Sequence, residues 1–485
     1  MKKYAINKVL GTAAVLAVAA YTLQGCKPDI EAGTPSAGAA DFSNFIAVGN
    51  SLTAGFADNG LNYEGQATSY PLILAQAMQA TGKGPAQFLQ PLFPVGSAGT
   101  GGLRLAGITN GLPVLAPVFP DSSQIIERIR TLFPDSITNK YAQVPNGMEI
   151  HNLGVPGIRV ADIESPVYGV SNNIAFNPFF ERMLPDNQGF MSYLSYVAKR
   201  RPTFFTNWLG NNDVLGYASA GGTGFLTNMA DFTASYGKML DTLTRGGAKG
   251  LIATVPKVTS APYFTTVPPT PIVLTDPTQV ALLNGAYAAR NAAIKRFNTL
   301  LPDAAKLDTI SFRLGPNAPV IAVSVTGPDS VYRRFGGPAG AFRQLRADRG
   351  ELILLPAQTV LPTGAGTATP LGNQFALTRE ELDAINARTN EINTYIRAQA
   401  TSRNLALFDA EAFLDQVKAG QVYFDGTNIT AAFVRGGAFS LDGIHPTPRG
   451  YALIANEMMK AINAKYGSNL SPVNAANYPA LQFPK

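Results

Sequence analysis

The sequence contains one cysteine, two histidines and one tryptophan among its 485 residues. A single thiol cannot form an intramolecular disulfide, and two imidazoles without a second cysteine cannot build the usual structural zinc site. Any mechanism that needs an imidazole is therefore limited to His151 or His445. Long apolar runs are also scarce: the only one lies at the N-terminus, which excludes a polytopic membrane protein.

Charge is sparse as well, since only 14% of the residues are charged while 46% are hydrophobic. With 47 glycines and 35 prolines, this composition indicates a loop-rich globular protein and excludes wholesale disorder, a coiled coil or a collagen-like repeat. Lys2, Lys3 and Lys8 lie in an N-terminal stretch without acidic residues, so the formal charge of the remaining chain falls from +6 to +3. We therefore expect no nucleic-acid partner.

Residues 1–25 have the layout of a secretory signal, with basic residues, an apolar stretch from Val9 to Leu23 and then Gln24-Gly25-Cys26. The segment resembles a bacterial lipoprotein signal, in which the cysteine becomes the lipidated first residue, although Gln24 departs from the usual small or β-branched residue. The alternative is an ordinary secreted protein. The resemblance implies an exported protein with lipidation at Cys26, anchored to a bacterial membrane at the periplasmic face of the outer membrane or at the cell surface. Residues 26–40 are expected to be a flexible tether.

From Phe42 onward, short apolar runs alternate with amphipathic helical patterns, which is typical of a βαβ protein. We expect a flavodoxin-like three-layer α/β/α sandwich with a five-stranded, mostly parallel sheet, formed by residues 41–256 and 376–485. The predicted strands are Phe45–Gly49, Met148–Leu153, Pro202–Leu209, Gly250–Val255 and Leu405–Asp409.

Helical periodicity predicts helices at Tyr70–Ala80, Phe190–Lys199, Met229–Arg245 and Pro277–Leu300. A further helix follows Thr378, because Thr378 and Glu381 have the spacing of a capping box. The last helix carries an apolar stripe that includes Tyr451 and Met458.

Three segments exceed what this core needs: 81–146, 160–188 and 257–375. The third contains a helical pattern and the strand-like runs Pro319–Ser324 and Glu351–Leu355, so we expect a folded insertion or cap. The second is rich in phenylalanine, which indicates either a lid over an apolar substrate or satellite packing under a loop; its aromatic residues are Phe176, Phe179 and Phe180.

Residues that could take part in a reaction, both polar residues and glycines, follow the ends of the predicted strands. Ser51 comes directly after the first strand, at the sheet edge where open α/β sheets bind ligands, and suits a nucleophile. Gly154 follows the second strand and would let a substrate approach its N–H, whereas Asn212 follows the third and could donate to a developing negative oxygen. Asp442 and His445 lie three residues apart before the last helix, so one loop can present a carboxylate and an imidazole.

Each of these residues also has a purely structural interpretation. Ser51 could be a helix cap, Gly154 a turn residue and Asn212 a cap, and we expect Asp213 to cap the following turn. His151 lies within the second predicted strand, where a packed, hydrogen-bonded histidine is expected.

Taken in order, four blocks resemble the SGNH hydrolases, also called the GDSL lipase and esterase family. The blocks are Val48-Gly49-Asn50-Ser51-Leu52, Asn152-Leu153-Gly154, Gly210-x-Asn212-Asp213 and Asp442-x-x-His445-Pro446. The resemblance implies a Ser51 nucleophile, a His445 base with Asp442, and an oxyanion hole made of the Ser51 and Gly154 N–H groups and the Asn212 side chain. It implies no metal or organic cofactor. Asn50 stands where the family has its name-giving Asp, and the run Phe439–Thr447 looks like the ending of exported lipoprotein members.

The resemblance implies a serine ester hydrolase, similar to carboxylesterases and lipases, that acts on a small-molecule, lipid or glycan ester. One alternative is a carbohydrate acetylesterase, for which we expect an open cleft with exposed aromatics instead of an apolar tunnel. Another is a surface lipoprotein that binds a ligand with a catalytically decayed hydrolase fold. Trp208 is expected to pack in the core beside the third strand.

Overall fold

The computed structural model describes residues 33–109, 112–130, 137–145, 147–171, 173, 175–185, 190–336, 340–424 and 426–481. The chain divides into two compact units, Met1–Pro35 and Ser36–Lys485, and the second contains every element discussed below. The predicted signal segment and Cys26 lie outside the described residues. Within the described ranges, none of the helices combines the length and the apolar character needed to cross a membrane.

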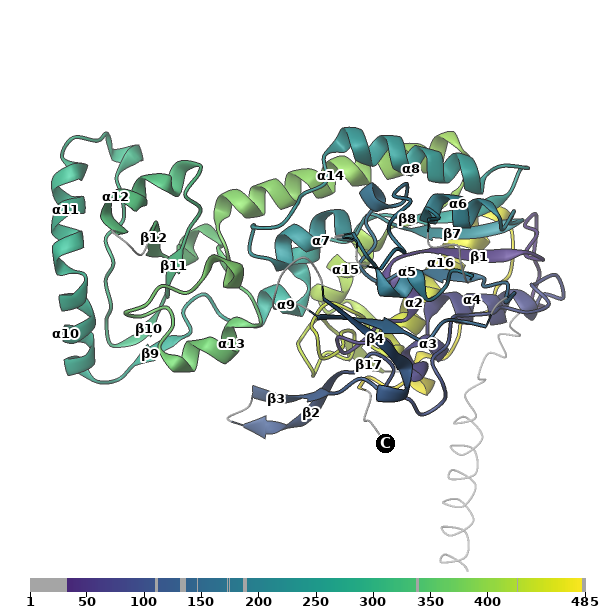
Figure 1. The fold of residues 1–485 in the computed structure, drawn as a ribbon, viewed down its shortest axis with the longest axis horizontal. Helices are drawn as coiled ribbons and strands as arrows, with labels where there is room; N and C mark the ends of the chain where they lie inside the picture. The colour runs from purple at the N-terminus through teal and green to yellow at the C-terminus, as the bar shows by residue number, and fades with distance from the viewer. Residues whose placement is uncertain are drawn as a thin grey trace, which may run out of the picture. The chain divides into compact units, whose positions relative to one another are not determined.

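Five parallel strands form the central sheet in the order β15-β8-β7-β1-β6 (Figure 1). They are β1 (Phe45–Gly49), β6 (Asn152–Gly154), β7 (Phe204–Trp208), β8 (Lys249–Ala253) and β15 (Ala406–Phe408). This confirms the predicted α/β fold class and its flavodoxin-like strand order. The chain places β6 on one side of β1 and β7 on the other, so the order reverses beside β1, where such sheets bind ligands.

Helices cover both faces of the sheet because its strands alternate between two cores. In β1, Phe45 and Ala47 belong to the core under α4 (Tyr70–Gln79) and α16 (Pro448–Tyr466). Ile46 and Val48 face the other core, which is closed by α6 (Tyr193–Ala198), α8 (Met229–Leu243) and α14 (Arg379–Ser402). Figure 1 shows these three layers. The predicted capping box opens α14, since Thr378 N–H donates to the Glu381 carboxylate at 2.7 Å.

Three predicted elements differ from the structure by more than two residues at one end or are divided. The second strand begins at Asn152 instead of Met148, because Met148 N–H closes a turn onto Pro145 O. The predicted helix at 277–300 is two helices, α10 (Pro277–Ala286) and α11 (Ala288–Asn298), which meet at Tyr287. Tyr287 leaves the helical conformation with ψ near 0° and buries its ring while its hydroxyl donates to Thr367 O at 2.5 Å.

The third difference lies at the start of α6. This helix begins at Tyr193, three residues later than expected, because Ser192 accepts a hydrogen bond from Ser195 N–H and caps it.

The described residues of the predicted insertion 257–375 are folded around small apolar cores of their own. A fully buried Arg343 pairs there with Asp329 at 2.7 Å and with Glu351 at 2.6 Å. Two of the short strands fall within the strand-like runs of the sequence. Antiparallel pairs join β9 (Ile272–Leu274) with β10 (Gly315–Asn317), β11 (Val320–Ala322) with β12 (Phe342–Gln344), and β13 (Leu352–Ile353) with β14 (Ala376–Leu377).

The predicted tether is too long at its C-terminal end. Residues 36–40 pack on the fold: Ser36 exchanges backbone hydrogen bonds with Asn469, and Ala37 and Ala40 are buried. Gly38 adopts a φ of +54°, and a Cβ there would lie 2.4 Å from Gly467 O. The small residues that suggested flexibility therefore allow a close approach to the end of α16.

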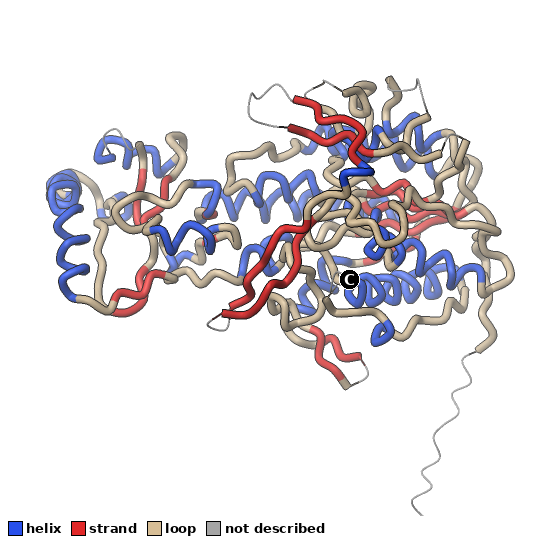
Figure 2. The backbone as a smooth tube through the Cα atoms, turned by 60° about the horizontal axis from the view of Figure 1, so that its bottom comes forward, coloured by secondary structure: helices blue, strands red, loops and turns tan. Residues whose placement is uncertain are grey.

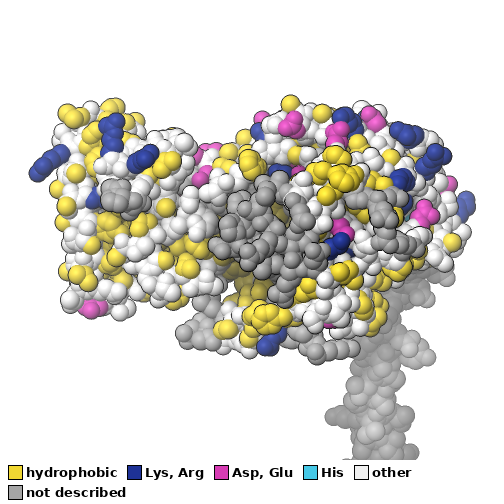
Figure 3. Space-filling view, viewed as in Figure 1, with side chains coloured by type: hydrophobic (Ala, Val, Ile, Leu, Met, Phe, Trp, Pro, Cys, Tyr) yellow, Lys and Arg dark blue, Asp and Glu magenta, His cyan; other side chains and the backbone are white. Residues whose placement is uncertain are grey.

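Two-stranded ribbons lie outside the central sheet (Figure 2). They are β2 (Gly102–Thr109) with β3 (Leu112–Val118), β4 (Ile125–Arg130) with β5 (Ile137–Tyr141), and β16 (Val422–Phe424) with β17 (Thr427–Ile429). Short helices complete the fold: α3 (Tyr63–Ala67), α5 (Pro178–Glu181), α9 (Pro262–Thr265), α12 (Arg333–Gly336) and α13 (Ala357–Val360). On the face drawn in Figure 3, Lys and Arg side chains are interspersed with Asp and Glu.

Candidate active site

Ser51 is the first residue of a four-residue helix, α2 (Ser51–Ala54), which follows β1 directly. The fully buried Asn50 caps this helix, since its Oδ1 accepts a hydrogen bond from Leu52 N–H at 3.0 Å. Asn50 thus holds the loop as its shape predicts, but its Nδ2 has no partner among the described residues. The first N–H groups of a helix lack intrahelical acceptors, so the Ser51 N–H is available at the carboxyl edge of the sheet.

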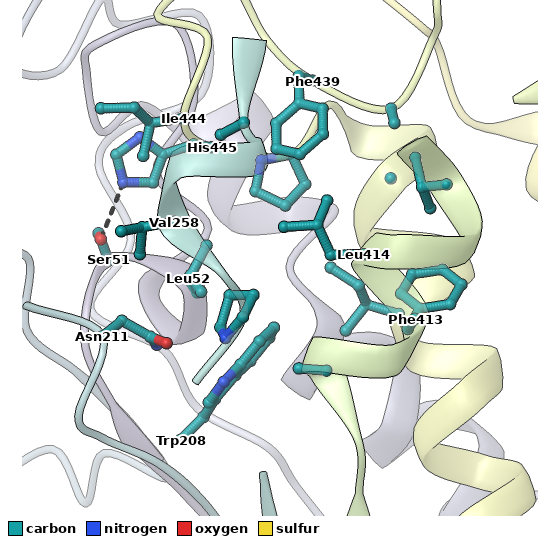
Figure 4. A pocket seen from close by; sticks show the side chains of 18 of the residues that line it. Ser51, Leu52, Trp208, Asn211, Val258, Phe413, Leu414, Phe439, Ile444 and His445 are labelled. Atoms are coloured by element: carbon teal, nitrogen blue, oxygen red, sulfur yellow. Dashed lines mark hydrogen bonds between the residues drawn. The ribbon is translucent and has the colours of Figure 1, made fainter. Parts of the chain in front are cut away.

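The structure brings Ser51, His445 and Asp442 into one hydrogen-bonded chain. His445 Nε2 lies 2.9 Å from Ser51 Oγ (Figure 4). His445 Nδ1 lies 2.8 Å from Asp442 Oδ2. The hydroxyl and the imidazole come from opposite ends of the sequence. This is the geometry of a nucleophile, a base and a group that orients the base.

Asp442 is held as a carboxylate by several donors. Its Oδ1 accepts the backbone N–H groups of Ile444 and His445, both at 2.8 Å, and its Oδ2 also accepts Asn59 N–H at 2.9 Å. Burial alone would raise the pKa of Asp442, but the charge and hydrogen bonds of His445 outweigh it and lower the pKa to about 2. An ionised Asp442 assigns the proton of the neutral ring to Nδ1, which leaves Nε2 to accept the Ser51 proton.

A turn at residues 57–60 docks onto the loop that carries Asp442. Asp58 N–H donates to Ser440 Oγ at 2.9 Å, and Asp58 Oδ1 accepts Leu441 N–H at 2.8 Å. Asp58 and Asn59 have φ values of +52° and +60°, a conformation that Asp and Asn tolerate better than most residues. Asp58-Asn59-Gly60 is recognisable in the sequence as a turn, but nothing in the sequence shows what the turn contacts.

The ring of Phe56 also contacts His445. Its ring centre lies 4.7 Å from that of His445 and 6.3 Å from that of Phe179. Phe180 is completely buried in the core, and Phe176 is partly buried. These contacts favour satellite packing over a lid for the phenylalanine-rich segment.

Two of the predicted oxyanion donors have partners within the protein. The Gly154 N–H donates to Asn152 Oδ1 at 3.0 Å, and a Cβ on Gly154 would lie 2.3 Å from Ala54 N. Gly154 therefore allows α2 to pack closely against β6. Asn212 Nδ2 donates to Ile158 O at 2.9 Å, which leaves its second amide hydrogen for another acceptor.

The prediction that Asp213 caps the following turn is wrong. The N-cap of α7 (Asn212–Ser219) is Asn211, and the Asp213 carboxylate accepts the Val160 N–H at 2.8 Å instead. Asp213 is completely buried, which raises its pKa to about 6 in spite of this bond. It therefore ties α7 to the segment after β6.

His151 is half-buried and lies just before β6. Its side-chain hydrogen bond is to Leu89 and not to Ser51. Its Nδ1 accepts Leu89 N–H at 3.1 Å, and burial lowers its pKa, which favours the neutral ring that such a bond requires. His151 is thus the packed, hydrogen-bonded histidine that we expected.

A pocket opens beside Ser51 and His445 (Figure 4). Its space, including the open mouth, is about 880 Å³. Apart from Asn50, Ser51, Asn211, Asn212 and His445, its walls are apolar. Trp208 is buried as expected and its indole N–H donates to Thr254 O at 3.1 Å, yet its ring also forms part of the pocket wall.

The far wall of the pocket was not apparent from the sequence. It comes from α15 (Ala410–Lys418), a helix that we did not predict, and from α16, whose apolar stripe we expected to serve only core packing. Phe413, Leu414 and Val417 of α15 and Leu453 and Ile454 of α16 line it. Because the side chains that line a pocket have the same helical spacing as those that fill a core, periodicity alone cannot tell the two apart.

Residues 340–458 match the family model described as GDSL-like Lipase/Acylhydrolase. This match places a GDSL-like lipase/acylhydrolase domain at residues 340–458. The matched region of this GDSL-like domain includes Asp442 and His445, and it begins within the segment 257–375 that we expected to be an insertion. This family supports a hydrolase that acts on acyl esters. No curated protein matches the chain.

The buried Asp58 carboxylate gives a pH-dependent test of this site. Burial raises the pKa of Asp58 to about 6, although the Leu441 N–H lowers it. A carboxyl group whose pKa is higher in the folded than in the unfolded chain opposes folding as the pH rises through that range. We expect Asp58→Asn to increase the free energy of unfolding at pH 8, by up to about 3 kcal/mol, and to change it much less at pH 4.

Urea unfolding of the parent and variant proteins at both pH values measures this effect. Asp121→Asn is the matched control, because hydrogen bonds from Ser123 lower the pKa of that exposed carboxyl, so the control should give no gain at pH 8. Equal destabilisation by Asp58→Asn at both pH values would contradict the prediction.

Proposed function

We propose that this protein is a serine ester hydrolase that cleaves acyl esters through Ser51, His445 and Asp442. The observation that carries the proposal is the hydrogen-bonded chain from Ser51 Oγ through His445 to Asp442, placed at the mouth of an apolar pocket. The acyl-ester chemistry of the GDSL-like family points in the same direction.

In the proposed reaction, His445 Nε2 takes the Ser51 proton as Oγ attacks the ester carbonyl carbon. The tetrahedral oxyanion then collapses, the bond to the alcohol oxygen breaks, and the imidazolium gives its proton to the departing alcohol. Water, deprotonated by the same imidazole, attacks the acyl-enzyme and releases the acid and free Ser51. Asp442 remains ionised throughout and stabilises the imidazolium.

The oxyanion needs donors that face it when the carbonyl carbon becomes tetrahedral. The Ser51 N–H and the second amide hydrogen of Asn212 fit this role. Gly154 would join them only if its N–H exchanged Asn152 Oδ1 for the oxyanion.

The pocket supports an apolar acyl group as the part of the substrate bound beside Ser51. A carbohydrate acetylesterase, the alternative within the enzymes, needs room for only two acyl carbons and polar groups for the sugar. The apolar walls formed by Trp208, Leu414 and Phe439 favour a longer acyl chain.

The first test is removal of the nucleophile and the base. Ser51→Ala and His445→Ala should each lower kcat/KM for p-nitrophenyl acyl esters by about 10⁴-fold or more, since triad residues act as a unit. A fluorophosphonate probe should label Ser51 in the parent protein.

The matched controls are the exposed Ser195→Ala and the second histidine, His151→Gln, both of which should keep activity. Activity that survives Ser51→Ala would end the assignment. A folded protein that neither hydrolyses esters nor reacts with the probe would favour the decayed, ligand-binding lipoprotein.

The second test concerns acyl-chain length. Each methylene that enters the pocket should raise kcat/KM by about 4-fold, because burying a CH₂ contributes about 0.8 kcal/mol. Leu414→Trp should fill the far wall and abolish the gain beyond short chains while hydrolysis of the acetyl ester persists. Rates for esters from acetyl to octanoyl, together with acetylated xylan, provide the measurement.

Leu282→Trp, on an exposed position of α10, is the control and should leave the chain-length profile unchanged. The highest activity on acetyl esters and acetylated xylan would instead support the carbohydrate acetylesterase.

We also propose that the protein is exported and lipid-anchored through Cys26. The support is the signal-like layout of residues 1–25 and the position of the only cysteine at its end. In a bacterium grown with a labelled fatty acid, the protein should carry the label and sediment with membranes, whereas Cys26→Ala should do neither. A Cys26→Ala protein that keeps the label would refute the anchor.

A further inference from the structure

The pocket contains one buried amide whose polar atoms are both unused. Asn211 is 4% exposed, and neither its Oδ1 nor its Nδ2 has a hydrogen-bond partner among the described residues. The side chain lines the same pocket as Ser51 and His445, and Figure 4 shows it directed into the pocket.

Asn211 precedes α7 with helical backbone angles, φ −61° and ψ −44°, and its side chain forms no capping hydrogen bond. A buried amide group without a hydrogen-bond partner is destabilising. An amide turned into a substrate pocket at such a cost indicates that a ligand completes it.

The other polar side chains of the pocket have partners. Ser51 and His445 bond each other, and Asn212 donates to Ile158 O. Asn50 Oδ1 accepts Leu52 N–H, although Asn50 Nδ2 has no partner among the described residues, so Asn211 is the pocket amide with both polar atoms unpaired. Around them the walls are apolar. Asn211 therefore offers a donor and an acceptor together within a surface that otherwise suits a hydrocarbon chain.

We propose that Asn211 determines specificity by binding a hydroxyl group on the acyl chain of the substrate, so that the preferred substrates are esters of hydroxylated fatty acids. A hydroxyl both donates and accepts, which satisfies Oδ1 and Nδ2 at once. The proposal rests on the proposed ester hydrolase, and it adds the class of acyl group to it. A substrate without the hydroxyl would enter the pocket but leave the amide unpaired, which is how polar sites reject apolar analogues.

The test compares the methyl esters of hexanoic acid and of 2-, 3- and 6-hydroxyhexanoic acid by continuous titration of the acid released. For the parent protein, kcat/KM for at least one hydroxyester should exceed that for the hexanoate by about 10- to 100-fold. Asn211→Leu, which keeps the shape and removes both polar atoms, should reverse this ratio in favour of the hexanoate.

Labelling of Ser51 by a fluorophosphonate in Asn211→Leu verifies that the variant is folded and its nucleophile intact. Calorimetric binding of hexanoate and the hydroxyhexanoates to Ser51→Ala tests the same preference without turnover, and is decisive if the parent proves inactive.

A ratio unchanged by Asn211→Leu overturns the proposal, as does a parent preference for the plain hexanoate over all three hydroxyesters. An equal loss on all four esters also overturns it, because Asn211 would then act on the reacting carbonyl. Each of these results contradicts the role of Asn211 but not the proposed ester hydrolase. If the parent protein showed neither labelling nor turnover, the proposed hydrolase itself would be contradicted.

Discussion

The hydrogen bond of 2.9 Å between Ser51 Oγ and His445 Nε2 joins residues separated by 394 positions, and the arrangement of the site depends on it. Ser51 and His445 are held in position by different parts of the structure. Ser51 is positioned by the sheet, because β1 lies between two strands, is fully buried and is followed at once by a capped turn of helix. His445 lies on a loop, so its position has to come from side-chain and backbone contacts. The donors to Asp442 and the Phe56 ring against the imidazole supply them.

Much of the fold can be predicted from the sequence, because strand and helix boundaries depend on residues that are close together in the chain. β1 has the predicted bounds, and the Thr378 capping box opens α14 where the spacing of Thr and Glu predicts it. The strand-end positions of Ser51, Gly154 and Asn212, and the Asp442-His445 spacing, could likewise be read from the chain. Predictions were wrong where a contact distant in sequence overrides the local pattern. Residues 36–40 look like a tether but fit against α16, and Tyr287 interrupts a regular helical run to bury its ring.

The same limit applies to the polar side chains of the site. Asn211, Asn212 and Asp213 are neighbours in sequence, yet their environments differ completely. Asn212 bonds Ile158 O, Asp213 is buried against Val160 N–H, and Asn211 faces the pocket without a partner. The spacing of a motif identifies such a cluster but does not show which role each residue has, because the hydrogen-bond partners of Asn212 and Asp213 lie on a segment more than 50 residues away. Only the folded arrangement of α7 against the residues after β6 separates the three.

The segment that interrupts the predicted hydrolase core also contributes to the loop that carries the base. Tyr263, at the start of α9, donates its N–H to Gly443 O at 2.9 Å, and its own carbonyl accepts Leu355 N–H at 2.8 Å. Gly443 has a φ of +70°, and a Cβ there would lie 2.8 Å from Tyr263 N, so the approach requires a glycine between Asp442 and His445. The turn at residues 57–60 contacts the same loop through Asp58 and Asn59. Because the loop is held from two sides, residues of the inserted segment help to position His445.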